Sequence, residues 1–178
     1  MAANGCVLIG YRACGKTSFG QGLAERCGWR FRDSDQEIEA AQGYGIAAAF
    51  ELDGVAAFRQ REAAVIARLL TEPGQVLATG GGCIETVATR ESLRRGPHPV
   101  IYLQAPAAVL QARLRADSGG RPSLTGDDPA AEVPAVLARR ENWYRQCADI
   151  VVSSDQPPPA VYAALLVAVE NWSTRVEN

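Results

Sequence analysis

Lysine is almost absent from this chain. Of its 18 basic side chains only Lys16 is a lysine, and the others are arginines. On a solvated surface the two cations are largely interchangeable, since an exposed ion pair contributes only about 0–1 kcal/mol. Where a compact ammonium must reach between anionic oxygens, however, the wide planar guanidinium is a poor replacement. The position of the single lysine therefore marks Lys16 as a candidate functional residue.

Histidine is equally scarce. The only one, His98, stands between Pro97 and Pro99, which predicts a turn residue and not a catalytic base. The five cysteines form no C-x-x-C pair and no cluster with His98, which argues against a bound metal cluster. We interpret them as reduced thiols of a cytoplasmic protein.

The sequence also lacks a basic excess and a long hydrophobic run. A net charge of −2 and a pI near 5.5 argue against broad binding to nucleic acid or to an anionic membrane. No apolar run approaches the ~18 residues of a membrane span, and residues 1–4 are too short and uncharged for a signal peptide. With 178 residues, 47% of them apolar, we expect a single domain, residues 1–178, with a proper core.

Apolar runs alternate with helical patterns, which is typical of an α/β domain with a mainly parallel sheet. Strands are predicted at residues 6–9, about 29–32, 75–79, about 100–103 and 149–152. One helix is predicted at about 16–27 and another begins at residue 34. Two more helices are predicted within residues 45–70, separated near residues 53–54, and one follows the 100–103 strand and ends near residue 115. The last two are predicted at about 129–147 and about 159–170. Ser34 and Glu37 fit a capping box. Residues 116–128 lack periodicity, which predicts a long functional loop or lid.

Residues 10–17, Gly-Tyr-Arg-Ala-Cys-Gly-Lys-Thr, match the phosphate-loop pattern G-x-x-x-x-G-K-[ST], between a predicted strand and a predicted helix. The backbone N–H groups of such a loop, the helix N-terminus and Lys16 together bind the phosphates of a nucleoside triphosphate. The hydroxyl of Thr17 would bind Mg²⁺. A GTPase would also need an N-K-x-D signature, which a chain with its only lysine at position 16 cannot contain. The residues expected to bind the nucleotide phosphates are Ala13, Cys14, Gly15, Lys16, Thr17 and Ser18.

Asp33 and Asp35 follow the second predicted strand, at the edge where ligands of open α/β sheets bind. The third strand ends in Thr79 and glycine, so it offers no aspartate for the Mg²⁺ of a phosphate-loop site. Asp33 is therefore a candidate metal ligand, although it could equally just favour a helix N-terminus. For Asp35 a functional role is favoured, because a hydroxyl substrate needs a nearby acceptor and the chain has no other histidine than His98.

Three consecutive glycines, residues 80–82, end the third predicted strand. A plain turn needs one or two glycines, so the run suggests that a small molecule packs directly on the backbone. Arg59 precedes Glu62 by three residues on a predicted helix. The two could form an ordinary surface pair, or Arg59 could grip a substrate carboxylate in bidentate fashion.

Two further arginine positions attract attention. Arg121 lies in the 116–128 loop, where a mobile arginine could close over phosphates and neutralise charge in the transition state. Arg139 and Arg140 lie in the middle of a predicted helix with Tyr144, and they could equally belong to a solvated face.

Together these segments resemble the shikimate kinase family over nearly the whole chain. The matching stretches are residues 10–17, Asp33-Ser34-Asp35, Phe58-Arg59 with Glu62, Gly80-Gly81-Gly82, Arg121-Pro122, and Arg140 with Tyr144. The resemblance implies an enzyme that transfers the γ-phosphate of ATP to the 3-hydroxyl of shikimate, on the route to aromatic amino acids, with Mg²⁺ as cofactor. It implies a three-layer α/β/α fold with a five-stranded parallel sheet, a substrate-binding region at about 34–62 and a lid at about 116–128. A monomer is expected.

The resemblance also implies roles for individual residues. The implied catalytic residues are Lys16, Asp35 and Arg121. The implied shikimate-binding residues are Asp35, Arg59, Gly80, Gly81, Gly82 and Arg140, beside an apolar wall of Ile46, Phe50 and Phe58. The implied Mg²⁺ ligands are Thr17 and Asp33. Arg121 is also expected on the nucleotide, and Arg113 is expected near the adenine, with Arg115 as its rival.

Two positions depart from the family pattern, Val55 where glutamate is usual and Ser123 where leucine is common. Neither position belongs to the residues that the resemblance implies for catalysis or binding. One alternative is another small phosphate-loop kinase such as gluconate kinase, because a polyol acid would also suit Arg59 and Asp35. A second is a catalytically silent ATP-binding module, which would need neither the arginine pair nor the three glycines.

Overall fold

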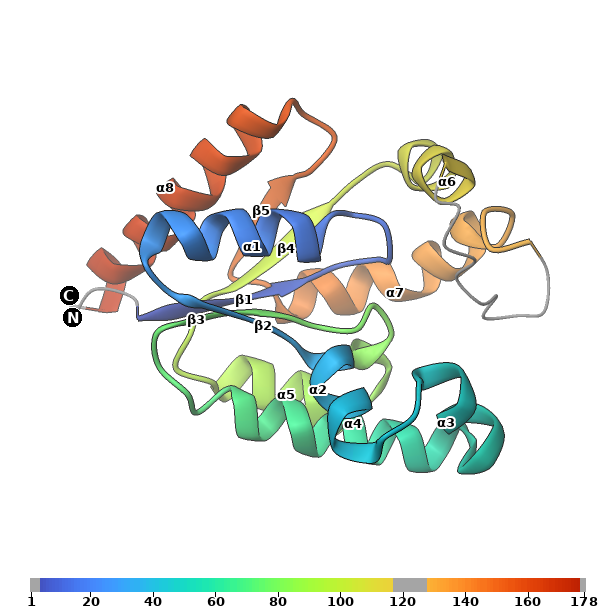
Figure 1. The fold of residues 1–178 in the computed structure, drawn as a ribbon. Helices are drawn as coiled ribbons and strands as arrows, with labels where there is room; N and C mark the ends of the chain where they lie inside the picture. Colours follow the sequence, from blue (N-terminus) through green and yellow to red (C-terminus); the bar gives the residue numbers. More distant parts are fainter. Residues whose placement is uncertain (1–3, 117–127, 177–178) are drawn as a thin grey trace.

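The computed structural model describes residues 4–116 and 128–176, and it contains one parallel sheet (Figure 1). Five strands form the sheet in the order β2-β3-β1-β4-β5. They are β1 (Gly5–Ile9), β2 (Arg30–Asp33), β3 (Gln75–Ala78), β4 (Val100–Gln104) and β5 (Ile150–Ser153). Every pairing is parallel, so all carboxyl ends of the strands meet at one edge. This confirms the predicted α/β class and the five-stranded sheet.

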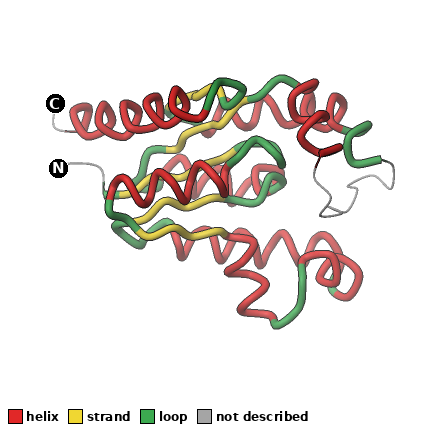
Figure 2. Tube along the Cα trace, turned by 45° about the horizontal axis from the view of Figure 1, so that its top comes forward, coloured by secondary structure: helices red, strands yellow, loops and turns green. Residues whose placement is uncertain are grey.

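Helices cover both faces of the sheet (Figures 1 and 2). On one face α1 (Lys16–Cys27) packs against α8 (Pro158–Val176), and the other face carries α4 (Gly54–Leu69), α5 (Val87–Arg95) and α7 (Val133–Cys147). The central strand β1 is buried along its whole length, as expected for a strand of a parallel sheet covered on both faces. The predicted three-layer architecture is therefore present, and none of the described helices is long and apolar enough to cross a membrane.

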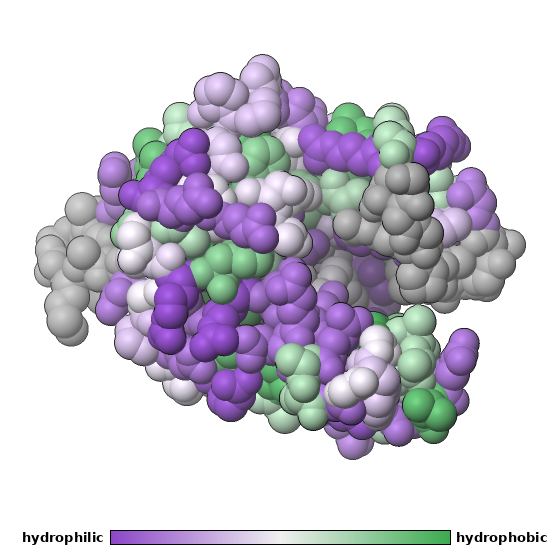
Figure 3. Space-filling view, viewed as in Figure 1, coloured by the Kyte–Doolittle hydropathy of each residue, from purple (hydrophilic) through white to green (hydrophobic). Residues whose placement is uncertain are grey.

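A smaller unit extends from the carboxyl edge of the sheet. It consists of α2 (Ser34–Gln42) and α3 (Ile46–Leu52), which pack on α4 around a separate small core of Ile38, Ala49 and Phe58. Two apolar side chains at the α3–α4 junction, Leu52 and Val55, are 71% and 59% exposed. In Figure 3 the corner near α3 accordingly shows hydrophobic residues beside strongly polar ones. This unit corresponds in sequence to the region predicted to bind substrate.

The start of α2 differs from the prediction. Asp33, not Ser34, is the N-cap, and its carboxylate accepts a hydrogen bond from the N–H of Asp35 at 3.0 Å. The side chain of Ser34 is buried and accepts from the N–H of Gly80 at 3.0 Å, so it connects α2 to the glycine run. Glu37 pairs with Arg32 at 2.6 Å. The predicted capping box is therefore wrong, because both of its side chains have partners outside the helix terminus.

Other boundaries differ at particular helices. Helix α7 begins at Val133, four residues later than predicted, and α8 runs to Val176 where an end near 170 was expected. The short helix η1 (Cys83–Glu85) and α5 follow the glycine run, where no helix was predicted. Helix α6 (Ala107–Ala116) ends as predicted. Of the predicted lid, residues 117–127, with Arg121, lie outside the described residues.

Candidate active site

The phosphate loop connects β1 to α1 at the centre of the sheet's carboxyl edge. Its backbone has positive φ at Gly10 (146°), Ala13 (63°) and Gly15 (97°). A Cβ on Gly10 would lie 2.6 Å from the carbonyl oxygen of Leu103, so this position requires glycine. Ala13 is the one non-glycine residue with positive φ in the described chain, and such backbone strain is characteristic of functional loops.

Lys16 is held inside this loop. Its ammonium donates to the carbonyl oxygens of Gly10 at 2.8 Å and Tyr11 at 2.9 Å, and it lies 3.7 Å from the sulfur of Cys14. The residue is 9% exposed. The ammonium thus lies inside the curve of the loop, next to the N-terminus of α1, where backbone N–H groups favour an anion. The oxygens of an anionic ligand bound in the loop would replace these two carbonyl oxygens as partners of the ammonium.

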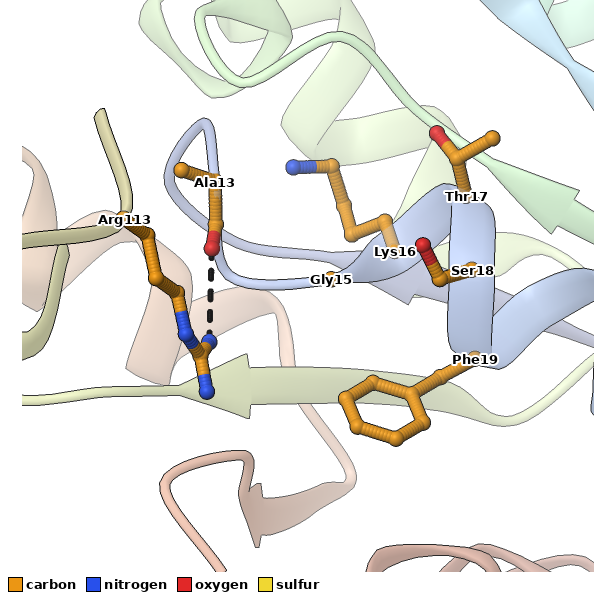
Figure 4. Close-up of a pocket in the computed structure, with 7 residues that line it drawn as sticks. All are labelled: Ala13, Gly15, Lys16, Thr17, Ser18, Phe19 and Arg113. Carbon is orange, nitrogen blue, oxygen red and sulfur yellow. Dashed lines mark hydrogen bonds between the residues drawn. The ribbon is translucent and has the colours of Figure 1, made fainter. Parts of the chain in front are cut away.

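A pocket opens beside the loop (Figure 4). Figure 4 shows Lys16, Thr17 and Ser18 at the start of α1 and Arg113 of α6 on the opposite side. The Arg113 guanidinium donates to the carbonyl oxygens of Ala13 at 3.3 Å and Ser154 at 2.6 Å. Arg115 is exposed and is not among the lining residues. Of the two candidates for the adenine side, the structure brings only Arg113 to the pocket.

The two predicted metal ligands contact each other. The hydroxyl of Thr17 donates to Oδ2 of Asp33 at 3.2 Å. No cluster of three or more His, Cys, Asp or Glu residues able to hold a metal occurs within residues 4–116 and 128–176. One hydroxyl and one carboxylate are the donor set expected of a Mg²⁺ site that takes its other ligands from phosphate and water.

Asp35 lies between this pair and the glycine run. Burial is the main cause of a raised pKa at Asp35, which reaches about 6, and the Asp33 carboxylate adds to the rise. The cations of Lys16 and Arg59 oppose it. A carboxylate with a pKa near 6 is ionised at neutral pH and remains a competent proton acceptor.

The three glycines lie close against other groups of the site. A Cβ on Gly80 would lie 2.5 Å from Oδ1 of Asp35, and a Cβ on Gly82 would lie 2.1 Å from Nη2 of Arg59. At Gly81 it would lie 3.1 Å from the backbone nitrogen of Arg12. Gly80 and Gly82 therefore face side chains of the site, and Gly81 faces the backbone of the phosphate loop. This supports the interpretation that the run provides bare backbone at a ligand site.

Arg59 and Arg140 come together beside these glycines from α4 and α7. Arg59 donates to Oε2 of Glu62 at 2.7 Å, and Glu62 is 1% exposed. Burial raises the pKa of Glu62 to about 7, against the lowering effect of Arg59. Arg140 is 3% exposed and lies beside Tyr144, which donates to the carbonyl oxygen of Gly81. Arg140 is thus buried in the site and does not belong to a solvated face.

Sequence reasoning missed Glu85, which follows the glycine run by three residues. Its carboxylate lies 2.9 Å from Nη2 of Arg140 and 3.3 Å from Nη2 of Arg59. It also missed the role of Arg12, which forms a buried ion pair with Glu132 and donates to the carbonyl oxygen of Pro129. No motif signals either contact, because both depend on how α7 packs on the rest of the fold.

His98 lies far from this chemistry. It precedes β4, at the opposite edge of the sheet, and its Nε2 is 3.0 Å from the carbonyl oxygen of Glu72. Burial lowers its pKa. The predicted non-catalytic role of His98 agrees with this position, and all five cysteines are free thiols.

The phosphate loop opens at the carboxyl edge of a five-stranded parallel sheet, with Asp33 and Asp35 beside it. This fold and this loop define the class of phosphate-loop kinases.

Comparison with known proteins narrows the class. The family model for shikimate kinase matches residues 12–170. A shikimate kinase from Oleidesulfovibrio alaskensis is 45% identical over 161 residues, which cover 89% of this chain and 93% of the relative. A shikimate kinase from Acinetobacter baumannii, solved in complex with shikimate, superposes with a TM-score of 0.86 at 33% identity, covering 95% of this chain and 94% of that one. The chain belongs to the shikimate kinase family and is an ATP-dependent kinase.

A gluconokinase from Sinorhizobium meliloti also superposes, with a TM-score of 0.56 at 17% identity over 99% of this chain and 98% of that one. At this identity the likeness shows a shared fold alone. The gluconate kinase alternative therefore has no support beyond architecture.

Proposed function

We propose that this enzyme transfers the γ-phosphate of ATP to the 3-hydroxyl of shikimate, giving shikimate 3-phosphate and ADP. One observation carries the proposal: a half-buried acid lies close to two cations that belong to different parts of the site. Lys16 of the phosphate loop and Arg59 of α4 both lie near enough to Asp35 to lower its pKa. This arrangement suits a reaction that joins the end of a triphosphate to a hydroxyl of an acidic molecule.

On the nucleotide side, Lys16 would exchange its loop carbonyls for the oxygens of the β and γ phosphates. Phosphoryl transfer depends mainly on positioning and on neutralising charge, so a preorganised ammonium is suited to the task. Arg113 would lie against the adenine, at the pocket shown in Figure 4. Arg121 is proposed to close over the phosphates from the lid.

Mg²⁺ would be held by Thr17 and Asp33, whose side chains already lie 3.2 Å apart. When bound, the ion neutralises charge on the phosphate oxygens. The hydrogen bond between the two side chains supports this assignment, because it brings a hydroxyl and a carboxylate oxygen to one point beside the loop.

Asp35 is proposed to accept the proton of the substrate hydroxyl. Its raised pKa of about 6 leaves it ionised at neutral pH and close enough to that pH for efficient proton transfer. Because it lies within contact range of Gly80, a ring packed on the glycine run would present its hydroxyl groups to this carboxylate.

The substrate carboxylate would be bound by Arg59 and Arg140, whose guanidinium groups both reach the carboxylate of Glu85 beside the glycine run. Planar guanidinium groups bind carboxylates in bidentate geometry, with more directional specificity than an ammonium. Phe50 and Phe58, whose ring centroids are 4.6 Å apart, would form the apolar wall with Ile46.

The proposal is tested by measuring ADP release with ATP and either shikimate or gluconate. Turnover that depends on shikimate and is negligible with gluconate supports it. Robust turnover on gluconate alone would favour the alternative kinase, and nucleotide binding without turnover on either would favour a silent module. We further propose that the enzyme is a cytoplasmic monomer, and sedimentation in the presence and absence of both substrates tests the oligomeric state.

A further inference from the structure

The carboxylate of Glu85 binds both arginines proposed to hold the substrate carboxylate, Arg59 and Arg140. It ends η1, directly after the glycine run, and its side chain is 30% exposed. Its Oε1 accepts from Nε and Nη2 of Arg140 at 3.0 and 2.9 Å. Its Oε2 accepts from Nη2 of Arg59 at 3.3 Å. Each oxygen thus meets a different guanidinium, which is the arrangement that two convergent arginines offer to a bound carboxylate.

Both arginines already have acidic partners before any ligand arrives. Glu62 pairs with Arg59, and Glu85 pairs with both Arg59 and Arg140. Arg139, which is 64% exposed, has its Nη2 3.8 Å from Oε1 of Glu85. Glu62 is buried at 1% exposure, whereas Glu85 is partly open. An incoming acid therefore meets Glu85 first.

We propose that Glu85 is a positioning residue that sets the affinity and selectivity for the acidic substrate. It holds Arg59 and Arg140 in place in the substrate-free enzyme and competes with the substrate carboxylate for them. This inference rests on the proposed function. Since the carboxylate alone gains little by displacing Glu85, the hydroxyl contacts near Asp35 decide which acid stays bound, and simple monocarboxylates are excluded.

The test is Glu85→Gln, which keeps the length of the side chain and one acceptor oxygen but removes the charge. The KM for shikimate should fall about tenfold, the effect of one like charge removed from a partly exposed site. The kcat and the KM for ATP should stay within about twofold, because the reacting groups are untouched. Cyclohex-1-ene-carboxylate, which has the acid but no hydroxyl groups, should become a competitive inhibitor about tenfold stronger than against the unmodified enzyme.

Glu91→Gln is the matched control. It removes the same unit of charge from α5, where Glu91 is 55% exposed and lies 3.9 Å from Arg95. Every constant should be unchanged in this variant. If Glu85→Gln does not fold, Glu85→Met keeps similar volume without the charge and carries the same expectation.

A shikimate KM that is unchanged or raised in Glu85→Gln, with the unmodified enzyme active, would overturn the inference, since the glutamate would then merely order the arginines. If the unmodified enzyme does not turn over shikimate, the proposed function fails by itself. Calorimetry with cyclohex-1-ene-carboxylate then decides the inference separately. Tighter binding to Glu85→Gln than to the unmodified protein supports it, and equal or weaker binding contradicts it.

Discussion

Replacing Asp35 with asparagine should make the protein more stable and nearly inactive, because both effects follow from the loss of one ionised carboxylate. Burial raises the pKa of Asp35 from 3.8 to about 6. A shift of about two units, at about 1.36 kcal/mol each, sets an upper limit of about 3 kcal/mol on the cost of the charged form. Because the side chain is not fully buried, we expect asparagine to gain about 1–3 kcal/mol at pH 8.

The sign of this effect depends on pH. Since the pKa of the Asp35 carboxyl is higher in the folded protein, its contribution to stability is present below pH 3.8 and is lost as the pH rises through 6. Asparagine should therefore raise the Tm most at pH 8 and hardly at all at pH 4. For a chain of this size the gain at pH 8 corresponds to about 3–10 °C.

Thermal unfolding followed by circular dichroism at pH 8 and pH 4 measures the stability effect, and coupled ADP release measures activity. The kcat of Asp35→Asn should fall about 100-fold or more, as expected for loss of a general base. Asp53→Asn is the control, because Arg61 and Tyr44 lower the pKa of Asp53, so the same substitution there should lower the Tm at pH 8 and leave kcat unchanged. An Asp35→Asn protein that is less stable than the unmodified enzyme at pH 8, or that keeps most of its activity, would refute the reasoning.

Four further predictions concern the same site. Lys16→Arg should lower kcat about 100-fold although the charge is kept, since the ammonium fits between loop carbonyls at 2.8 and 2.9 Å; near-normal turnover would contradict this. Arg59→Lys should raise the shikimate KM by about 10- to 100-fold and leave ATP affinity within a few-fold, because a single ammonium replaces a fork; a loss of ATP binding instead would place Arg59 on the nucleotide side. Gly82→Ala should fold, because φ at this position is −97°, but its Cβ would displace the Arg59 guanidinium, so shikimate KM should rise with ATP KM constant. The kcat/KM for shikimate should fall about tenfold per pH unit below pH 6, where Asp35 becomes protonated; a flat profile between pH 5 and pH 7 would exclude Asp35 as the base.

The sequence predicts best the parts of the site that are specified locally. The phosphate loop and α1 (Lys16–Cys27) have the predicted boundaries, because a strand, a glycine turn and a helix N-terminus follow each other along the chain. Asp33 and Asp35 could be placed near the loop because they follow a predicted strand, and parallel strands present their carboxyl ends to one edge.

Features that depend on tertiary packing escaped prediction. Helix α5 is short and mostly polar and buries only Thr89 and Leu93, so it has no apolar run that would draw attention to it in the sequence. Ser34 is a residue type typical of an N-cap, yet its hydroxyl accepts a hydrogen bond from the N–H of Gly80, which follows the neighbouring strand β3. Glu85 belongs to no sequence motif. Its partners, Arg59 and Arg140, lie far away in the sequence on α4 and α7, so only the folded structure brings them together. The choice between Arg113 and Arg115 needed the orientation of α6.

A crystal structure with ADP and shikimate bound tests the central claim most directly. The account predicts the substrate carboxylate between Arg59 and Arg140, its ring on Gly80–Gly82, and its 3-hydroxyl within hydrogen-bond distance of Asp35 on the side facing the β-phosphate of ADP. A shikimate molecule bound away from the arginine pair, or with its 3-hydroxyl turned away from Asp35 and the nucleotide, would contradict it.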